Sequence, residues 1–238
     1  MSNQHVTFRN DMHVGLLDCF GNDSKVARVA RVSTRNDEAT PERDARLVNT
    51  LVSEGHMVPL EHAAMTFRIE CPIFVSRQIA THRMSSISEL SGRYSEMPPE
   101  FYVPGAHRKM GQIGSRMAYD MVDLGPERTA ATQGIIEAAS EQAWRSYEDA
   151  LRMGASREVA RMVLPVNAYT EIRMTMNLRS LLNFLSLRVD WKSLGYVNVA
   201  QPSHPQWEVQ EVALDMAEHL EDNFPAVWRA FQKKGFTA

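Results

Sequence analysis

The sequence predicts an α+β fold in which a mixed or antiparallel sheet packs against helices. Two observations support this fold class: helical segments outnumber strand segments, and the two kinds do not alternate regularly as they do in parallel α/β folds. A third observation is that no G-x-G-x-x-G motif is present. We therefore expect a fold other than a Rossmann fold.

Local patterns place the elements of the N-terminal half. A strand is expected at 14–20, followed by a helix at 23–33 that is capped by Asp23 or Ser24. Thr40 and then Pro41 supply a cap and a first-turn proline for a helix that ends before residue 55. The next expected elements are a strand over 65–70, a helix over 73–82, a polar stretch over 84–97 and a short strand over 101–103.

The C-terminal half begins with a segment at 104–126 that is rich in glycine and methionine, which is typical of a surface loop. Residues 169–177 alternate, with Ile172, Met174 and Met176 on one side, and this pattern predicts a strand. The other expected elements are helices over 127–153, 156–164, 179–190, 205–220 and 225–233, and a loop over 191–203.

Composition limits the classes of function. The 238 residues are enough for one large domain, and the net charge of -3 leaves no overall positive field to attract nucleic acid. Cys19 and Cys71 are too few for a disulfide framework or a cysteine zinc site, and their apolar contexts indicate buried free thiols. No segment has the pattern of a targeting peptide or a membrane span, so we expect a single cytoplasmic domain.

One stretch that could bind a ligand or take part in catalysis runs from Gln78 to residue 95. Gln78 and His82 lie four residues apart and share a helix face, and a serine-rich loop follows. Within that loop Ser91-Gly92-Arg93 could form a nest of backbone N–H groups beside a guanidinium, which suits a phosphate. From spacing alone, a solvated surface loop is the more frequent explanation.

Three further stretches carry polar residues in apolar surroundings. Arg161 either extends along an apolar surface to water or reaches into a site, and the pattern does not favour one explanation. Asn183 needs hydrogen-bond partners from a cofactor or from the core, and Arg188 ends an apolar helix. His56 and His62 are spaced unlike a helical metal pair, so we expect no metal and leave open a role as a general base or as a flavin contact.

Taken together and in order, these stretches resemble the flavin-dependent thymidylate synthases. The family signature of Arg-His-Arg, seven residues and Ser appears as Thr81-His82-Arg83 followed by Ser91. Other family motifs match at 55–62, 158–165, 177–188 and 204–208. The resemblance covers about 15–231 and treats 104–126 and 191–203 as variable loops.

The resemblance implies reductive methylation of deoxyuridylate (dUMP) to dTMP. The carbon donor would be 5,10-methylenetetrahydrofolate, and FAD reduced by NADPH would carry the hydride. It also implies a homotetramer whose active sites are shared between subunits. The partners would therefore be small molecules and other copies of the chain, with neither nucleic acid nor membrane involved.

Site residues follow from the same resemblance. It assigns dUMP to Gln78, Thr81, Glu89, Leu90, Ser91, Gly92, Arg93, Arg161 and Arg188. It assigns FAD to Val58, Thr81, His82, Arg83, Glu89, Asn177, Leu178, Arg179 and Asn183. Arg188 would contact the uracil and act as the catalytic residue by stabilising negative charge, because neither cysteine lies in a cationic setting that would lower the pKa of a thiol.

Three departures from the family pattern leave alternatives open. Thr81 replaces the first signature arginine, and threonine cannot replace a bidentate charge, although Arg77 lies one turn earlier. The loop from Trp191 to Gln201 resembles an insertion, and Val58 replaces a threonine. One alternative is a family member that binds FAD and dUMP but turns over slowly. The other is a non-enzymatic nucleotide or RNA binder, which the net charge disfavours.

Overall fold

The structure is a computed structural model that describes residues 5–33, 39–115 and 118–238. It divides into two compact units. Unit 1 comprises Met1–Asp11, Glu70–Arg77 and Glu89–Glu171, and unit 2 comprises Met12–Ile69, Gln78–Ser88 and Ile172–Ala238.

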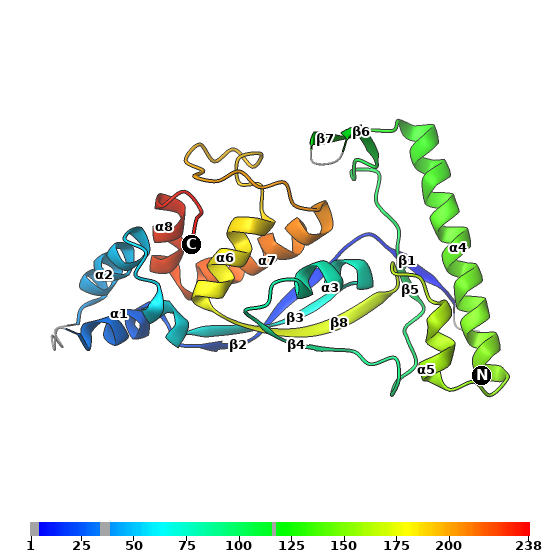
Figure 1. Cartoon of the computed structure of the whole chain (residues 1–238), viewed down its shortest axis with the longest axis horizontal. Helices are drawn as coiled ribbons and strands as arrows, with labels where there is room; N and C mark the ends of the chain where they lie inside the picture. Colours follow the sequence, from blue (N-terminus) through cyan, green and yellow to red (C-terminus); the bar gives the residue numbers. More distant parts are fainter. Residues whose placement is uncertain (1–4, 34–38, 116–117) are drawn as a thin grey trace. The chain divides into compact units, whose positions relative to one another are not determined.

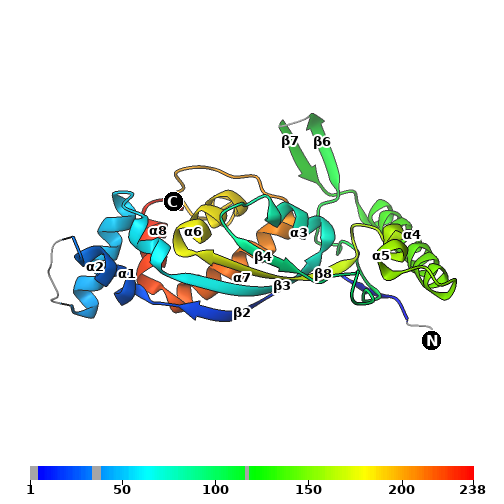
Figure 2. The ribbon, with the colours of Figure 1, turned by 60° about the horizontal axis from the view of Figure 1, so that its bottom comes forward.

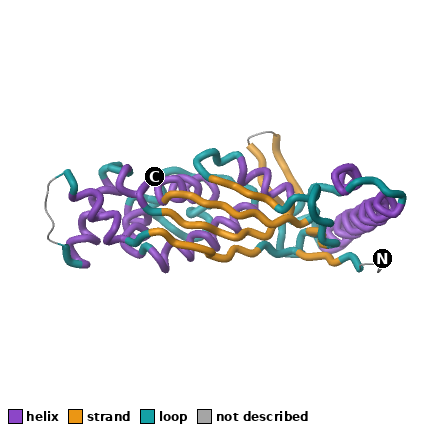
Figure 3. The backbone as a smooth tube through the Cα atoms, turned by 90° about the horizontal axis from the view of Figure 1, so that it is seen from below, coloured by secondary structure: helices purple, strands orange, loops and turns teal. Residues whose placement is uncertain are grey.

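A four-stranded sheet has the strand order β2-β3-β8-β4, and Figure 3 shows these strands side by side. The strands span His13–Phe20, Ala64–Pro72, Tyr169–Asn177 and Ser86–Glu89 in that order. Burial alternates along β3 and β8, and Ile172, Met174 and Met176 are buried as their spacing predicts. Helices with strands that pair in both parallel and antiparallel fashion confirm the α+β class.

Unit 2 holds most of the helices. They are α1 (Asp23–Arg31), α2 (Pro41–Ser53), the 3₁₀ helix η1 (Val58–His62), α6 (Leu178–Arg188), α7 (Trp207–Asn223) and α8 (Pro225–Lys233). Helices α1 and α8 both contact α2, as Figure 2 shows. Thr40 caps α2 by accepting a hydrogen bond from the backbone N–H of Arg43 at 3.3 Å, as expected from the sequence.

The predicted cap of α1 is wrong. Asn22 caps this helix, and its side-chain oxygen accepts from the backbone N–H of Lys25 at 2.9 Å. Asp23 instead caps the start of α8, because its carboxylate accepts hydrogen bonds from the backbone N–H groups of Ala226 at 2.8 Å and Val227 at 3.1 Å. Local sequence could not reveal this role, since the helix that Asp23 stabilises lies about 200 residues away.

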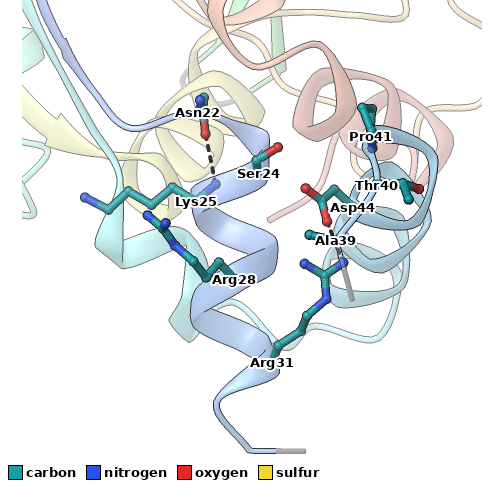
Figure 4. Close-up of a pocket in the computed structure, with 9 residues that line it drawn as sticks. All are labelled: Asn22, Ser24, Lys25, Arg28, Arg31, Ala39, Thr40, Pro41 and Asp44. Carbon is teal, nitrogen blue, oxygen red and sulfur yellow. Dashed lines mark hydrogen bonds and ion pairs between the residues drawn. The ribbon is translucent and has the colours of Figure 1, made fainter. Parts of the chain in front are cut away.

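A buried ion pair joins α1 to α2. Arg31 Nη2 donates to Asp44 Oδ1 at 2.5 Å, and Figure 4 shows the guanidinium reaching across to the carboxylate. Lys25 and Arg28, which line the same cavity of about 510 Å³, extend away from that pair. Removing one member of such a pair leaves an uncompensated buried charge, so the pair makes the α1–α2 packing specific.

Unit 1 is organised around the long helix α4 (Pro126–Arg152), labelled in Figure 1. Trp144 and Tyr147 of this helix pack with Met97 and Phe101 in the core of the unit. The remaining elements of unit 1 are β1 (Thr7–Arg9), which pairs in parallel with β5 (Glu100–Tyr102), the hairpin of β6 (Gly111–Ser115) and β7 (Ala118–Val122), α5 (Arg157–Ala160) and the 3₁₀ helix η2 (Arg161–Val163). Helix α3 (Ile73–Ala80) contributes residues to both units.

Several local predictions are corrected. The 104–126 segment contains the β6–β7 hairpin, although residues 116–117 lie outside the described part of the chain. The polar 84–97 stretch contains β4. Cys19 is half-buried rather than buried. In each case tertiary surroundings decide the outcome, because these segments have no strong apolar periodicity.

None of the helices within the described residues combines the length and the apolar composition needed to cross a bilayer.

Candidate functional site

A cavity of about 540 Å³ in unit 2 gathers residues from three of the motifs. Its lining consists of Gly55, Met57, Glu61, Met84, Asn177, Arg179, Ser180, Asn183 and Ala238. Three of these, Asn177, Arg179 and Asn183, belong to the residues that the resemblance assigns to FAD. The structure therefore brings a third of that predicted set to one concave surface.

The junction of β8 and α6 positions these three side chains. Asn177 ends the strand and caps the helix, with its side-chain oxygen accepting from the backbone N–H of Ser180 at 2.9 Å. Arg179 and Asn183 then lie one helical turn apart on the same face of α6. The end of β8 thus places Asn177, and the Asn177 cap sets the direction of the first turn of α6.

Asn183 is exposed, although it lies in an apolar helix. Of the two explanations that its sequence context allows, a hydrogen bond inside the core is therefore wrong. Within the described residues its side chain makes no hydrogen bond, and it lines the cavity. An amide presents both donors and an acceptor, so Asn183 can bind a ligand that carries both kinds of group.

Arg179 is paired with Glu61, which the sequence analysis does not place in the site. Arg179 Nη1 and Glu61 Oε1 lie 2.6 Å apart, and both side chains are partly exposed. Exposed pairs of this kind contribute at most about 1 kcal/mol to stability. The pair therefore matters mainly for the direction of the guanidinium along the cavity wall.

His82 lies buried behind the cavity wall. Its Nε2 is 3.1 Å from the backbone oxygen of Ser180 and 2.9 Å from Ser180 Oγ, while that hydroxyl donates to the carbonyl oxygen of Met84 at 2.6 Å. Both Ser180 oxygens must accept, so Nε2 is the protonated nitrogen. Burial and the nearby charge of Arg188 lower the pKa of His82, which is therefore neutral near pH 7.

Arg188, at the C-terminal end of α6, is half-buried, and burial lowers the pKa of its guanidinium. Its Nη2 donates to Thr81 Oγ1 at 3.0 Å. Among the described residues, Arg188 Nε is one of three buried side-chain nitrogens without a hydrogen-bond partner. A buried donor without a partner is costly, so it marks a position where a ligand acceptor can bind.

A second group of predicted residues lies in unit 1. The carboxylate of Glu89, at the end of β4, accepts from Ser76 Oγ at 3.2 Å and from Thr170 Oγ1 at 3.0 Å. Both hydroxyls converge on Oε1. The other carboxylate oxygen of Glu89 is thereby oriented and available to a ligand.

The loop after β4 forms a tight turn. The carbonyl oxygen of Ser91 accepts from the backbone N–H groups of Tyr94 and Ser95, each at 3.1 Å, and Ser91 Oγ accepts from the N–H of Arg93 at 3.3 Å. Arg93 also pairs with Glu158 at 3.2 Å. The turn therefore uses the N–H groups of Arg93, Tyr94 and Ser95 internally, and the exposed guanidinium of Arg93 is the group of this segment that can attract an anionic ligand.

Gly92 allows this turn to pack closely against Arg161. A Cβ atom at Gly92 would lie 3.0 Å from Arg161 Cδ and 2.9 Å from Met97 Sδ. The stem of Arg161 therefore packs on the turn, while Arg161 as a whole is exposed. The structure thus brings Arg161 and the 89–93 loop together, as the dUMP assignment requires.

Other predicted residues do not line the cavity of unit 2. Val58 is 61% exposed beside Met57, which does line it. Leu178 is buried, and its backbone N–H donates to the carbonyl oxygen of Ala63. Thr81, His82 and Arg83 are also absent from its lining, and Leu90 donates its backbone N–H to the carbonyl oxygen of Glu171 within unit 1.

Several contacting residues were missed by sequence reasoning. They are Met57, Glu61, Met84 and Ser180 at the cavity, and Ser76 and Thr170 at Glu89. Glu61 lay within a motif that had been singled out, so its motif was the available signal. The hydroxyl partners of Glu89 have no sequence signal, because pairing in three dimensions brings them together.

Known proteins are similar to this chain over most of its length. Residues 15–226 match the family described as thymidylate synthase complementing protein. The chain is 38% identical to the flavin-dependent thymidylate synthase of Thermosipho africanus, over 92% of this chain and 90% of that protein. It is 38% identical to the flavin-dependent thymidylate synthase of Streptomyces avermitilis, over 98% of this chain and 95% of that protein.

Solved structures give the same result. The UMP/dUMP methylase PolB from Streptomyces cacaoi, bound with 5-Br UMP, is similar with a TM-score of 0.88, 34% identity and 98% coverage of both chains. Its complex with 5-Br dUMP has a TM-score of 0.89. Together, the relatives and the fold define an enzyme of the methyltransferase class. Within that class, the chain belongs to the flavin-dependent thymidylate synthase family, which confirms the resemblance found in its motifs.

Proposed function

We propose that this chain catalyses the reductive methylation of dUMP to dTMP, with 5,10-methylenetetrahydrofolate as carbon donor and with FAD, reduced by NADPH, as hydride carrier. The observation that carries the proposal is the unit 2 cavity, on which Asn177, Arg179 and Asn183 converge. The proposed domain is the whole chain, acting in the cytoplasm without nucleic-acid or membrane partners. The proposed assembly is a homotetramer that shares its active sites.

The cavity suits a flavin and requires no Rossmann fold. Its walls combine amides and a guanidinium with the apolar side chains of Met57 and Met84, as a ring with polar edges and apolar faces requires. Asn183 is free to bind such an edge, and Arg179 is directed by Glu61. When bound, FAD would supply the hydride, and the protein would supply orientation and electrostatics.

The dUMP assignment rests on the unit 1 loop and on Arg188. Arg93 and Arg161 would hold the phosphate through their guanidinium groups, beside Ser91 and Gly92 of the same loop. Arg188 would bind the uracil through the nitrogen that lacks a partner among the described residues. Its positive charge would then stabilise the negative charge that develops on the ring.

Neither cysteine suits nucleophilic attack on the uracil. Burial raises the pKa of Cys71 to about 12, and burial also raises the pKa of Cys19. The thiolate is the reactive form, so neither thiol is activated near pH 7. Activation by Arg188 therefore remains the favoured route. A Cys19→Ser/Cys71→Ser double variant should keep its turnover, and loss of turnover with an intact fold would refute this route.

Anaerobic formation of dTMP from dUMP, methylenetetrahydrofolate and NADPH by the FAD-loaded protein is the direct test. UMP should be assayed in parallel, because the similar solved enzyme is described as acting on UMP and dUMP. Flavin-bound protein that oxidises no NADPH in response to dUMP would instead indicate a weakened family member. Protein that takes up no FAD would indicate the nucleotide binder and would refute the proposal.

A further inference from the structure

Thr81 stands where the family signature has its first arginine, and its hydroxyl lies between two partners. Thr81 Oγ1 donates to the carbonyl oxygen of Gln78 at 2.7 Å. The same oxygen accepts from Arg188 Nη2 at 3.0 Å. Both contacts lie within unit 2, and they connect the end of α3 with the end of α6.

The direction of these hydrogen bonds is fixed by chemistry. A hydroxyl has one proton, and the carbonyl of Gln78 can only accept, so the Thr81 proton points to Gln78. The lone pairs of Thr81 Oγ1 therefore face the guanidinium, which can only donate. An arginine at position 81 could not take this role, because a guanidinium has no acceptor.

We propose that Thr81 is a positioning residue that holds the Arg188 guanidinium in the orientation needed to bind the pyrimidine. This inference rests on the proposed function, in which Arg188 contacts the uracil. Among the described residues, Thr81 is the only side chain that accepts a hydrogen bond from Arg188, whose buried Nε has no partner. One nitrogen of the guanidinium is thus anchored, and another is left to the substrate.

The role of Thr81 as an acceptor changes the expected effect of replacing it with the arginine of the family signature. If Thr81 works as an acceptor, Thr81→Arg removes the anchor and places a second positive charge next to Arg188. Restoring the family residue should then impair this chain. A loss of charge alone would instead make Thr81→Arg beneficial.

The test uses FAD-loaded Thr81→Ser, Thr81→Val and Thr81→Arg, with Thr50→Val as matched control. Thr50 is an exposed helical threonine of unit 2 that donates to the carbonyl oxygen of Arg46, and among the described residues it accepts no hydrogen bond from an arginine side chain. Steady-state kcat and KM are measured together with dUMP affinity by calorimetry. We expect kcat/KM of Thr81→Ser and of Thr50→Val to stay within about twofold of the wild-type value. For Thr81→Val and Thr81→Arg we expect kcat/KM to fall about tenfold, which is the size of effect that loss of a hydrogen bond to a charged group produces.

A double-mutant cycle separates positioning from general damage. In an Arg188→Lys background, Thr81→Val should cost less than about twofold, because the partner is already altered. An equal loss in both backgrounds, or a Thr81→Val enzyme with wild-type kinetics, would overturn the inference. If the wild type forms no dTMP, the proposed function fails, while the same cycle in dUMP affinity still decides the role of Thr81.

Discussion

Gly92 shows how one missing Cβ atom shapes the proposed phosphate loop. In Gly92→Ala the new methyl group would lie 2.9 Å from Met97 Sδ and 3.0 Å from Arg161 Cδ, so both side chains must move. We expect KM for dUMP to rise about fivefold, equivalent to about 1 kcal/mol, because the guanidinium shifts from its place. Steady-state kinetics at saturating folate measure the effect.

The control for this prediction is Gly134→Ala in the exposed middle of α4. Apart from Gly134, its two neighbours and the backbone of its own helix, no atom of the described residues lies within 4 Å of a Cβ built at Gly134, so the methyl group meets open space. Alanine also favours the helix over glycine by roughly 0.5–1 kcal/mol. Urea unfolding of Gly134→Ala should therefore show a gain in stability, and its KM for dUMP should stay at the wild-type value. A wild-type KM for Gly92→Ala as well would contradict the proposed role of the loop.

His82 makes the stability of the fold depend on pH. Its pKa is lowered in the folded state, so the unfolded chain takes up the proton first as pH falls below about 6.5. The contribution of neutral His82 to the free energy of unfolding is therefore fully present above that pH, and it is lost as the pH falls through the lower folded-state pKa. Denaturant unfolding at pH 7.5 and pH 5.5 measures it.

We expect His82→Gln to lose less stability than wild type between these two pH values. His56→Gln, at an exposed position in the same unit, is the control and should behave like wild type. A His82→Gln protein with the full wild-type pH dependence would show that other groups account for it.

At the level of elements, Asp23 connects the start of α1 with the start of α8. Asp23→Ala removes the acceptor of two backbone N–H groups, and loss of such a cap costs about 1–2 kcal/mol. Thermal or urea unfolding should show this loss, whereas Ser24→Ala should change stability by less than about 0.5 kcal/mol. Equal effects of the two substitutions would refute the capping role of Asp23.

The elements also show where sequence reasoning succeeds. Strand β8 and the start of α2 were predicted correctly, because apolar alternation and the Thr40-Pro41 cap are strong local signals. Strand β4 and the β6–β7 hairpin were missed, because their largely exposed residues carry no burial pattern. Their pairing is decided by the partner strand rather than by their own sequence.

The same reasoning applies to the site. Asn177, Arg179 and Asn183 come from one continuous motif, so a single strand–helix junction brings them to the cavity. The contact between Thr81 and Arg188 joins residues 107 positions apart. No local pattern reports such a contact, and the sequence therefore indicated only a missing charge.

At the scale of the molecule, an aromatic cluster ties the 191–203 loop to the last residues of the chain. Trp191 stacks on Phe236 with ring centroids 4.1 Å apart, and Tyr196 meets the edge of the same ring. Asn198 and the backbone of Ala200 add hydrogen bonds to residues 233 and 235. The expected variable loop is therefore anchored, although it has no regular secondary structure.

Phe236→Ala tests this anchoring. Removing a buried aromatic ring should lower stability by about 3–5 kcal/mol and expose the 191–203 loop to proteases. Limited proteolysis with mass spectrometry would locate the new cleavage sites. Val197→Ala is the control, since Val197 is 100% exposed, and a Phe236→Ala loop that resists cleavage like wild type would contradict the anchoring.

The covered thiols of Cys19 and Cys71 have a practical consequence for labelling. Maleimides react with accessible thiolates, and both native sulfurs are disfavoured, one by complete burial and the other by partial covering and a raised pKa. A new cysteine at the fully exposed Val197 position would react first. A fluorophore can thus be attached to the anchored loop with both natural cysteines still in place.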